Sequence, residues 1–482
     1  MDTKKLRQKI LDLAIHGKLV PQDPNDEPAS VLLERIRAEK ERLIAEGKIK
    51  RSKKSATSDT SHYENVPFEV PEGWCWVKIR DLCYYLGGYA FKSTQYVASS
   101  DNQVIRIGNV KDDKILFESQ PVFITDDYAV TAESALLKNN DLLFTMTGTK
   151  GKRDYFKTSL VRVGKKRLFL NQRVGCLRSY STHVYMEYLC LAMKHTCVLD
   201  AIFQTETGNV SQGNIGSENT LDLLIPLPSL NEQKRIVQRF QDCISDIDSV
   251  ELNTIELKKV IERLKSKILD LAIHGKLVPQ DPNDEPASEL LKRINPKFVP
   301  CDNPHYANIP SSWVCTTMGS IFQHNTGKAL NKSASTEGAL LPYLTTSNVY
   351  WNTFDLSVVK EMRFKESEIE KCTIRKGDLL VCEGGDIGRA AIWDKDYSIC
   401  IQNHLHRLRP KGDVVPLLYL YYIMYLKLTN NLEGKGIGLQ GFSSGLLDKL
   451  EVPLPPYNEQ IRIVDKIQEA FNMLDSIAEL LN

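Results

Sequence analysis

The stretch KILDLAIHGKLVPQDPNDEPAS occurs twice without a single difference, at residues 9–30 and again at residues 267–288. A second repeat relates IPLPSLNEQKRIV, residues 225–237, to VPLPPYNEQIRIV, residues 452–464. The first repeat has an offset of 258 residues and the second an offset of 227. Repeats of this length decide the architecture, because each copy has to build the same local structure.

The two offsets combine into a circular order. At the offset of 227 the C-terminal residue Asn482 corresponds to residue 255, and at the offset of 258 Met1 corresponds to residue 259. The last 25 residues followed by the first 30 therefore reproduce one continuous central block, residues 231–288. We expect both copies to fold alike, which requires the two ends of the chain to lie side by side.

Weaker echoes between these blocks keep the same order along the chain. VPEGW parallels IPSSW, Gly108-Asn109-Val110 parallels Ser347-Asn348-Val349, and NNDLL parallels KGDLL. Each of the two stretches has short β-rich runs and one clearly helical segment, around residues 185–203 and 416–428. The pattern predicts two homologous mixed α+β domains that have diverged while the blocks between them stayed constant.

Apolar residues at alternating three- and four-residue steps predict that the repeated block is a long helix with a coiled-coil seam. A helix over residues 231–275 would be about 67 Å long at about 1.5 Å per residue, and the split copy would supply its antiparallel partner. Two separate bundle helices are the alternative. The predicted seam residues are Val237, Phe240, Ile244, Ile247, Leu257, Ile261, Leu264, Ile268 and Leu271 in the central copy, and Val464, Ile467, Phe471, Leu474 and Leu481 in the split copy.

Three local features of this helix are expected from the sequence. The seam changes phase near residues 250–256, which predicts an irregularity there. Asn231 and Asn458 stand where an N-cap is expected, each followed by a glutamate. Gly17 and Gly275 follow Ala-Ile-His and are typical of helix C-terminal stops.

The expected domain organisation follows from these repeats. It comprises an N-terminal part of the split helical region (1–46), a basic and serine-rich linker (47–65), a first globular domain (66–230), the central helical region (231–306), a second globular domain (307–457) and a C-terminal helix (458–482) that completes the split region.

Composition excludes several classes of protein. The 482 residues are 42% hydrophobic and 26% charged, with 62 Lys and Arg against 61 Asp and Glu, as in an ordinary globular protein with a core. No run approaches the roughly 18 apolar residues of a membrane span, and the start lacks the features of a secretory signal. The eleven cysteines include no C-x-x-C pair. We therefore expect a cytoplasmic chain with reduced thiols and no metal site.

No catalytic constellation is evident. Residues 436–441 read G-x-G-x-x-G, but no apolar strand precedes them, and residues 147–152 and 384–389 resemble only fragments of a phosphate loop. His404 and His406 alternate along an expected strand, which would place them on one face, but no neighbouring residue completes a metal site. The sequence therefore predicts no catalytic residues.

Basic and amide residues in the expected loops suit a nucleic-acid surface. Arg and Lys can bind phosphates or guanine, and Asn and Gln can read adenine, although ordinary surface polar groups have the same composition. The candidates are Lys150, Lys152, Arg153, Asn171, Gln172, Arg173, Asn209, Gln212 and Asn214 in the first domain, and Lys328, Lys332, Arg389, Gln402, Asn403, His404, Gln440 and Ser443 in the second.

Together these features resemble the specificity (S, or HsdS) subunit of type I restriction-modification systems, over essentially the whole chain. The resemblance rests on two divergent domains that each end in PLP-x-x-NEQ-x-RIV, and on circularly arranged helical linkers. It implies that each domain is a target-recognition domain reading one half of a bipartite, asymmetric site in double-stranded DNA. It also implies that the helices set the spacing and dock two methyltransferase (M) subunits, which restriction/translocase (R) subunits join.

The same resemblance implies a non-catalytic chain without cofactors, since S-adenosylmethionine, ATP and Mg²⁺ would belong to the partner subunits. Two half-sites one helical turn apart, about 34–36 Å centre to centre, would face the same side of the duplex. Two alternatives stay open at this point: a stand-alone DNA methyltransferase or nuclease with its own recognition domains, and a protein scaffold unrelated to DNA.

Overall fold

A computed structural model describes residues 2–51, 66–209, 211–298, 308–330, 337–429 and 443–481. The chain forms two compact units, here called the N-terminal unit (residues 2–252) and the C-terminal unit (residues 253–482). The division falls inside the helix α8 (Leu230–Ile273). Met1, Asn482 and most of the expected linker lie outside the described residues, so the adjacency of the chain ends stays a prediction.

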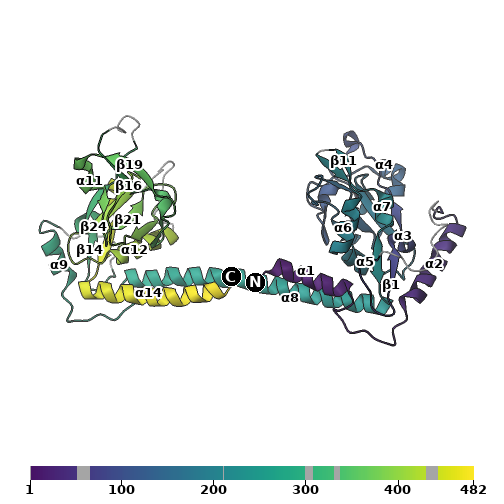
Figure 1. The fold of residues 1–482 in the computed structure, drawn as a ribbon, viewed down its shortest axis with the longest axis horizontal. Coiled ribbons are helices and arrows are strands. Elements are labelled where there is room, and N and C mark those ends of the chain that lie inside the picture. Colours follow the sequence, from purple (N-terminus) through teal and green to yellow (C-terminus); the bar gives the residue numbers. More distant parts are fainter. Residues whose placement is uncertain are drawn as a thin grey trace. The chain divides into compact units, whose positions relative to one another are not determined.

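The N-terminal unit combines helices with short strands (Figure 1). Its other helices are α1 (Thr3–Ile15), α2 (Ala29–Ala45), α3 (Ile79–Leu82), α4 (Asp126–Thr131), α5 (Met186–Ala192), α6 (Thr196–Gln204) and α7 (Ser217–Leu221). Its strands are β1 (Cys75–Lys78), β2 (Cys83–Leu86), β3 (Asn102–Ile105), β4 (Val110–Lys111), β5 (Lys114–Ile115), β6 (Leu142–Thr145), β7 (Thr147–Gly148), β8 (Thr158–Leu160), β9 (Arg167–Leu170), β10 (Val174–Ser179), β11 (Thr207–Asn209), β12 (Gln212–Asn214) and β13 (Leu224–Leu227).

The C-terminal unit has the same kinds of element. Its own helices are α9 (Ala287–Ile294), α10 (Met318–Ile321), α11 (Glu366–Cys372), α12 (Pro416–Leu428), α13 (Ser444–Asp448) and α14 (Tyr457–Leu480). Its strands are β14 (Val314–Thr317), β15 (Phe322–Thr326), β16 (Ala339–Leu344), β17 (Val349–Tyr350), β18 (Thr353–Phe354), β19 (Lys360–Phe364), β20 (Thr373–Ile374), β21 (Leu379–Cys382), β22 (Ala390–Ile392), β23 (Ile399–Ile401), β24 (Leu405–Pro410) and β25 (Glu451–Leu454).

Three strand arrangements recur in both units. A four-stranded antiparallel sheet in the order β2-β10-β6-β8 matches one in the order β15-β24-β21-β22. The pair β1-β13 matches β14-β25, and the parallel pair of β3 with β9 matches that of β16 with β23. The prediction of two homologous mixed α+β domains is confirmed.

The short echoes in the sequence are structural contacts. The aspartate of N-D-L-L, Asp141, accepts two hydrogen bonds from the Arg178 guanidinium at 2.8 and 2.6 Å. The aspartate of G-D-L-L, Asp378, accepts the same pair from Arg409 at 2.7 and 2.6 Å. Both carboxylates are 2% exposed. Such two-point pairing satisfies a buried carboxylate and links neighbouring strands of the main sheet.

The scaffold helices pair antiparallel within each unit, as predicted. In the N-terminal unit Arg7 on α1 binds Asp248 and Glu251 on α8, whereas Ile15 shares a core with Ile236. In the C-terminal unit Lys265 on α8 binds Asp475 on α14 at 2.5 Å. Farther along, Leu269, Ala272 and Ile273 pack with Ile463, Val464 and Ile467. Each pair shares one core with the globular domain of its unit.

The seam departs from its expected course in the second half of α8. Leu257 and Leu264 are 39% and 46% exposed, and Leu269 is buried instead. The reason is that this stretch of α8 packs against α14 and against the globular core. Its buried residues therefore face both of these surfaces and do not keep to a two-helix seam. α8 is continuous through residues 250–256, so the predicted irregularity is wrong.

The other expected seam residues lie on the packed faces. Val237, Ile247, Ile261, Val464 and Ile467 are buried, and Phe240, Ile244, Ile268, Leu271, Phe471, Leu474 and Leu481 are partly buried.

The helix ends differ from expectation at one terminus. Asn231 lies inside α8, and it is Ser229 whose hydroxyl accepts the Glu232 backbone N–H, at 3.1 Å. Asn458 likewise lies inside α14, so the N-cap prediction is wrong. The C-terminal stops are confirmed: Gly17 and Gly275 have φ angles of 66° and 65°, which a side chain would disfavour.

The helical segment at residues 185–203 is interrupted in the N-terminal unit. α5 ends at Ala192, and α6 begins at Thr196 after His195, whose ring accepts the Cys197 backbone N–H at 3.3 Å. The corresponding α12 of the C-terminal unit runs without a break. The prediction of a single helix is therefore wrong for the N-terminal unit.

Ile467→Ala tests whether the α8–α14 contact stabilises the C-terminal unit. Ile467 is 0% exposed, so its truncation is expected to lower the free energy of unfolding by about 2–5 kcal/mol through lost burial and a cavity. Ile477→Ala, on the same helix but 44% exposed, is the control and should change it by less than about 0.5 kcal/mol. Equilibrium urea unfolding of both variants measures the difference, and equal effects would contradict this packing.

Candidate nucleic-acid interface

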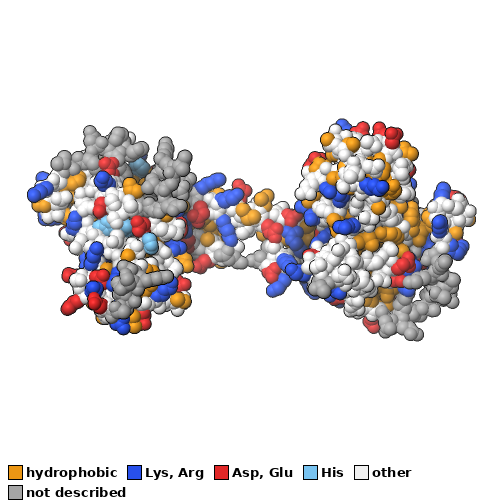
Figure 2. Space-filling view, turned by 90° about the horizontal axis from the view of Figure 1, so that it is seen from above, with side chains coloured by type: hydrophobic (Ala, Val, Ile, Leu, Met, Phe, Trp, Pro, Cys, Tyr) orange, Lys and Arg blue, Asp and Glu red, His pale blue; other side chains and the backbone are white. Residues whose placement is uncertain are grey.

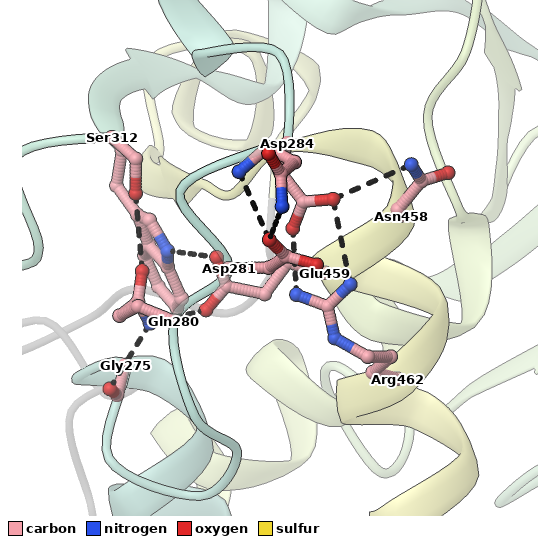
Figure 3. Close-up of polar contacts among 10 residues, drawn as sticks. Gly275, Gln280, Asp281, Asp284, Ser312, Asn458, Glu459 and Arg462 are labelled. Carbon is pink, nitrogen blue, oxygen red and sulfur yellow. Dashed lines mark hydrogen bonds and ion pairs between the residues drawn. The ribbon is translucent and has the colours of Figure 1, made fainter.

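A buried carboxylate, Glu459, joins three segments of the C-terminal unit (Figure 3). Its Oε2 accepts the Trp313 indole N–H at 2.9 Å, and its Oε1 accepts the Gln280 side-chain amide at 2.5 Å. Glu459 is 1% exposed, and this burial raises the pKa of its carboxyl group. The contacts tie the first turn of α14 to the connector after α8 and to the residue before β14.

The N-terminal unit contains the same contacts between the equivalent residues. Glu232 accepts the Trp74 indole N–H at 2.9 Å and the Gln22 amide at 2.5 Å. Glu232 is 3% exposed, and burial again raises the pKa of its carboxyl group. We call these two sets, Glu459–Trp313–Gln280 and Glu232–Trp74–Gln22, the Glu–Trp clusters.

An aspartate of the repeated connector strengthens each junction (Figure 3). Asp284 accepts hydrogen bonds from the Arg462 guanidinium at 2.6 Å and from the Asn458 amide at 3.4 Å, and the bond from Arg462 lowers the pKa of the Asp284 carboxyl group. In the N-terminal unit, Asp26 makes the corresponding bonds with Arg235 at 2.7 Å and Asn231 at 3.3 Å. The repeated blocks therefore attach each globular domain through one set of contacts.

The amide-rich turn between β9 and β10 lies against the loop that follows β2. Tyr89 donates its backbone N–H to the Leu170 carbonyl at 2.8 Å, and Gln172 donates to the Tyr89 carbonyl at 3.1 Å. A Cβ on Gly88 would lie only 2.3 Å from the Asn171 carbonyl oxygen, so this close approach requires glycine. Asn171 is partly buried, whereas Gln172 and Arg173 are exposed.

The C-terminal unit builds the equivalent turn from different residues. Lys328 donates its backbone N–H to the Ile401 carbonyl at 3.0 Å, and Asn403 donates to the Lys328 carbonyl at 2.9 Å. Gln402 and Asn403 are partly buried, and His404 is exposed, 3.5 Å from a Glu383 oxygen. The backbone is thus held alike in the two units while the side chains differ.

A second group of candidate residues gathers on the sheet β11-β12-β7 of the N-terminal unit. β12 pairs with β7 through Gly213–Gly148 and Asn214–Thr147. The Lys150 ammonium donates to the Gly208 carbonyl at 2.9 Å, and Gln212 lies 3.4 Å from the Asn214 side-chain oxygen. The structure therefore brings together candidates from the segments 150–153, 209–214 and, through the Met146–Arg173 backbone bond, 171–173.

Several candidate side chains already have protein partners. Arg153 binds Asp200 at 2.6 Å, although both side chains are 54% exposed. Lys328 is largely buried and binds Glu368 at 2.6 Å and the Arg363 carbonyl at 2.8 Å. Arg389 donates to the Thr346 carbonyl at 2.6 Å and lies over the Tyr350 ring. Of these three, Arg153 remains the most accessible to a ligand.

The remaining candidates are placed as follows. Lys152 and Asn209 are exposed, Asn214 is partly buried, and Ser443 is exposed directly before α13. Lys332, Gln440 and the G-x-G-x-x-G stretch lie outside the described residues.

The expectation that His404 and His406 share a strand face is wrong. His404 precedes β24 and is exposed, whereas His406 is 0% exposed and its Nδ1 lies 2.9 Å from His324 Nε2.

Positive charge is scattered over the outer face of the N-terminal unit. On the face in view, Figure 2 shows Lys and Arg side chains among apolar and uncharged ones, and those of the residues that the structure describes form no continuous basic patch there. This distribution agrees with the net charge of +1 for the chain. An interface with DNA on this face would depend on individual side chains more than on a general positive field.

A cleft also lies between the scaffold helices and the globular domain of each unit, with similar volumes of about 420 and 450 Å³. In the C-terminal unit Gln468, Phe471, Asn472 and Asp475 line it. In the N-terminal unit the residues 227 positions earlier, Gln241, Ile244, Ser245 and Asp248, line it. The duplication thus produces two clefts that share four equivalent helix residues, although α8 and α14 line the C-terminal one and α8 lines the N-terminal one.

A family model, the type I restriction modification DNA specificity domain, matches residues 71–263 and 310–482. The matched segments cover most of the chain and include both Glu–Trp clusters apart from the connector glutamines. The chain belongs to this family.

Curated members of the specificity family resemble the chain over nearly its whole length. The EcoEI specificity subunit of Escherichia coli is 26% identical, with 99% of this chain and 90% of that protein aligned. The EcoAI specificity subunit of Escherichia coli is 27% identical over the same shares. The stand-alone methyltransferase or nuclease is therefore not favoured.

Solved structures agree in fold. The HsdS subunit of Thermoanaerobacter tengcongensis superposes with a TM-score of 0.56 at 19% identity, covering 86% of this chain and 93% of that one. A chain from a study of assembly and conformational transition in a type I restriction-modification system gives 0.54 at 17% identity, covering 86% and 94%.

The Glu–Trp clusters were missed by the sequence analysis of this specificity-family chain. Their tryptophans lie in the quoted VPEGW and IPSSW echoes, and their glutamates lie in the two NEQ motifs. The available signal was that the tryptophan and the glutamate both recur at matching positions of the repeat. They are separated by 158 residues in one unit and 146 in the other, so no local spacing pattern predicts their contact.

Glu459→Gln tests the importance of the charged acceptor. An amide nitrogen would face either the Trp313 indole or the Gln280 amide, leaving two donors opposed, so we expect a loss of about 1–3 kcal/mol in the free energy of unfolding. Glu469→Gln on the same helix is the control, because its pair with Lys466 is about half exposed and contributes little. Urea unfolding measures the free energy of unfolding of both variants. An unchanged value for Glu459→Gln would contradict a structural role for the cluster.

Proposed function

We propose that this chain is the DNA-specificity subunit of a type I restriction-modification complex. Each unit reads one half of a bipartite, asymmetric site in double-stranded DNA, and the chain itself catalyses no step. The observation that carries the proposal is that the two units share their internal and scaffold contacts while their turn residues differ. A shared frame with different polar surfaces fits two readers of different short sequences.

In the N-terminal unit, the reading surface comprises the turn 171–173, the loop 150–153 and the hairpin of β11 and β12. Gln172 and Arg173 are exposed on a turn whose backbone is fixed by hydrogen bonds to Tyr89. Amide and guanidinium groups at such a fixed turn can form paired hydrogen bonds with adenine and guanine edges. The lysines of the neighbouring loop supply phosphate contacts.

In the C-terminal unit, the reading surface is the turn 402–404. The exposed His404 occupies the position equivalent to Arg173 of the N-terminal unit. The Lys328 backbone fixes the turn through hydrogen bonds to Ile401 and Asn403. The different side chains at an equivalent backbone position would select a different half-site. Ser443, before α13, adds a hydroxyl that can contact phosphate or base.

The scaffold helices set the separation of the half-sites and bind the partner subunits. The equivalent clefts would offer one docking position on each unit, which would suit two methyltransferase subunits per chain. Exposed apolar side chains on the scaffold supply further contact surface, as expected at a protein–protein interface. They are Val250 and Leu252 in the N-terminal unit, and Ile255, Leu257, Val260, Leu264, Met473, Ile477 and Leu480 in the C-terminal unit.

The partner subunits would supply the chemistry. S-adenosylmethionine, ATP and Mg²⁺ would bind to methyltransferase and restriction/translocase subunits, and the complex would act on DNA in the cytoplasm. No helix among the described residues has both the length and the apolar character needed to cross a lipid bilayer.

Exchange of residues 66–230 for the first recognition domain of another family member tests the modular reading. The exchange keeps Glu232, Gln22 and the scaffold helices, and a donor domain with tryptophan at the position of Trp74 would restore the cluster. We therefore expect only one half of the recognised site to change. Mapping of methylated adenines after reconstitution with methyltransferase subunits measures the outcome. A change in both halves would show that the units do not read independently.

Arg173→Ala tests the reading turn at a single residue. Loss of a paired contact to a base edge costs about 1–3 kcal/mol, so binding of the complex to its own site should weaken about 5–150-fold. Arg167→Ala is the control, since Arg167 begins β9, the strand that leads into the turn, and its charge is paired with Glu133 at 2.6 Å. Fluorescence anisotropy with duplex DNA measures the affinity of both variants. Equal losses of affinity would contradict a role for the turn in reading DNA.

A further inference from the structure

Two histidines and an aspartate meet where α1 contacts the break between α5 and α6. Asp12 and His16 lie one helical turn apart on α1, and His195 lies 183 residues from Asp12 along the chain. The Asp12 Oδ1 atom is 3.2 Å from His195 Nε2 and 3.6 Å from His16 Nδ1. One donor atom from each of the three residues lies within 4.8 Å of the others.

These separations suit a small divalent metal ion. Zinc bonds to imidazole nitrogen and carboxylate oxygen are about 2.0–2.2 Å long, which places neighbouring ligands of a tetrahedral ion roughly 3.3–3.6 Å apart. The Asp12–His16 separation of 3.6 Å lies at the upper end of this range, and the Asp12–His195 separation of 3.2 Å lies just below its lower end. Two histidines with one carboxylate are also a recurrent ligand set for zinc sites that keep a fourth position for water.

The surroundings fix the orientation of both rings. His195 is 2% exposed, its Nδ1 accepts the Cys197 backbone N–H at 3.3 Å and lies 2.9 Å from Cys197 Sγ, and the opposite nitrogen, Nε2, faces Asp12. Metal binding through Nε2 would move the ring proton to Nδ1 and give up the bond from the Cys197 backbone. The His16 ring stacks on Phe68 with 3.9 Å between centroids. Binding through His16 Nδ1 would replace the hydrogen bond that this atom makes with the Asp12 carbonyl at 2.8 Å.

The site is also open to solvent. The side chains of Asp12 and His16 are 38% and 27% exposed, so an ion could reach them from solvent.

The duplication supplies an internal comparison. The identical block of the C-terminal unit places Asp270 and His274 in the same arrangement, with 3.3 Å between Asp270 Oδ1 and His274 Nδ1. There the third partner is the Tyr425 hydroxyl, 3.2 Å from Asp270 Oδ1, on the uninterrupted α12. Burial raises the pKa of Tyr425, so its phenol stays protonated and is a poor ligand. The third ligand is therefore specific to the N-terminal unit.

We propose that Asp12, His16 and His195 form a binding site for one zinc-like divalent ion that links α1 to the first recognition domain. The ion would stabilise the attachment of the N-terminal helix, and the C-terminal unit would have a hydrogen bond in its place.

Zinc titration of the chelator-treated full chain tests the site. We expect one Zn²⁺ per chain by isothermal titration calorimetry, with slower amide exchange in α1 when zinc is present. His195→Tyr copies the C-terminal arrangement and keeps a hydrogen-bond donor near Asp12, so the fold should survive. Because loss of an outer partner of a ligand already costs about 10–100-fold in metal affinity, this variant should bind at least about 100-fold more weakly.

His274→Ala is the matched control, since it removes the same histidine from the other copy of the block and should leave zinc binding unchanged. The proposal is overturned if the chelator-treated wild-type chain binds zinc no better than His195→Tyr. It is also overturned if His274→Ala loses as much affinity, or if zinc leaves amide exchange in α1 unchanged. Circular dichroism of each variant shows whether a loss of zinc affinity reflects unfolding. If His195→Tyr is unfolded, His16→Ala takes its place as the test, because His16 is partly exposed and its removal should weaken zinc binding without unfolding the chain.

Discussion

The hydrogen bonds from tryptophan and glutamine to a buried glutamate are the constraint on which the architecture depends. Glu232 and Glu459 are nearly inaccessible, and each accepts one bond from the residue leading into the first strand of its domain and one from the repeated connector. A buried carboxylate is costly unless its oxygens are satisfied. The requirement for these partners therefore holds helix, connector and globular domain together in each unit.

This constraint explains which parts of the two units stayed alike. Asp141 and Asp378 make the same two-point bonds to arginines, and the side chains of Asn109 and Asn348 each bind two backbone carbonyls in their loops. All four are buried, so replacing any of them would leave unpaired polar groups. Exposed turn residues face no such penalty, and at these positions Arg173 and His404 differ.

Sequence reasoning reached the fold because its signals were repetition and periodicity. The circular order of the repeats predicted antiparallel scaffold helices, and Arg7–Asp248 and Lys265–Asp475 now show that pairing in each unit. It failed where a local pattern competed with packing. Leu264 matches a heptad but is exposed, because α8 packs on a globular core as well as on α14. Asn231 resembles a cap, but Ser229 makes the bond.

The sequence by itself determined that the chain is a circular duplication with two divergent domains on a common helical frame, because identical segments impose identical backbone structure. Only the tertiary structure decided which polar residues meet. Trp313 and Glu459, or Asp12 and His195, are separated by well over a hundred residues, and no spacing rule connects them. Contacts of this kind arise when separate elements share one core, so they follow from packing and not from local pattern.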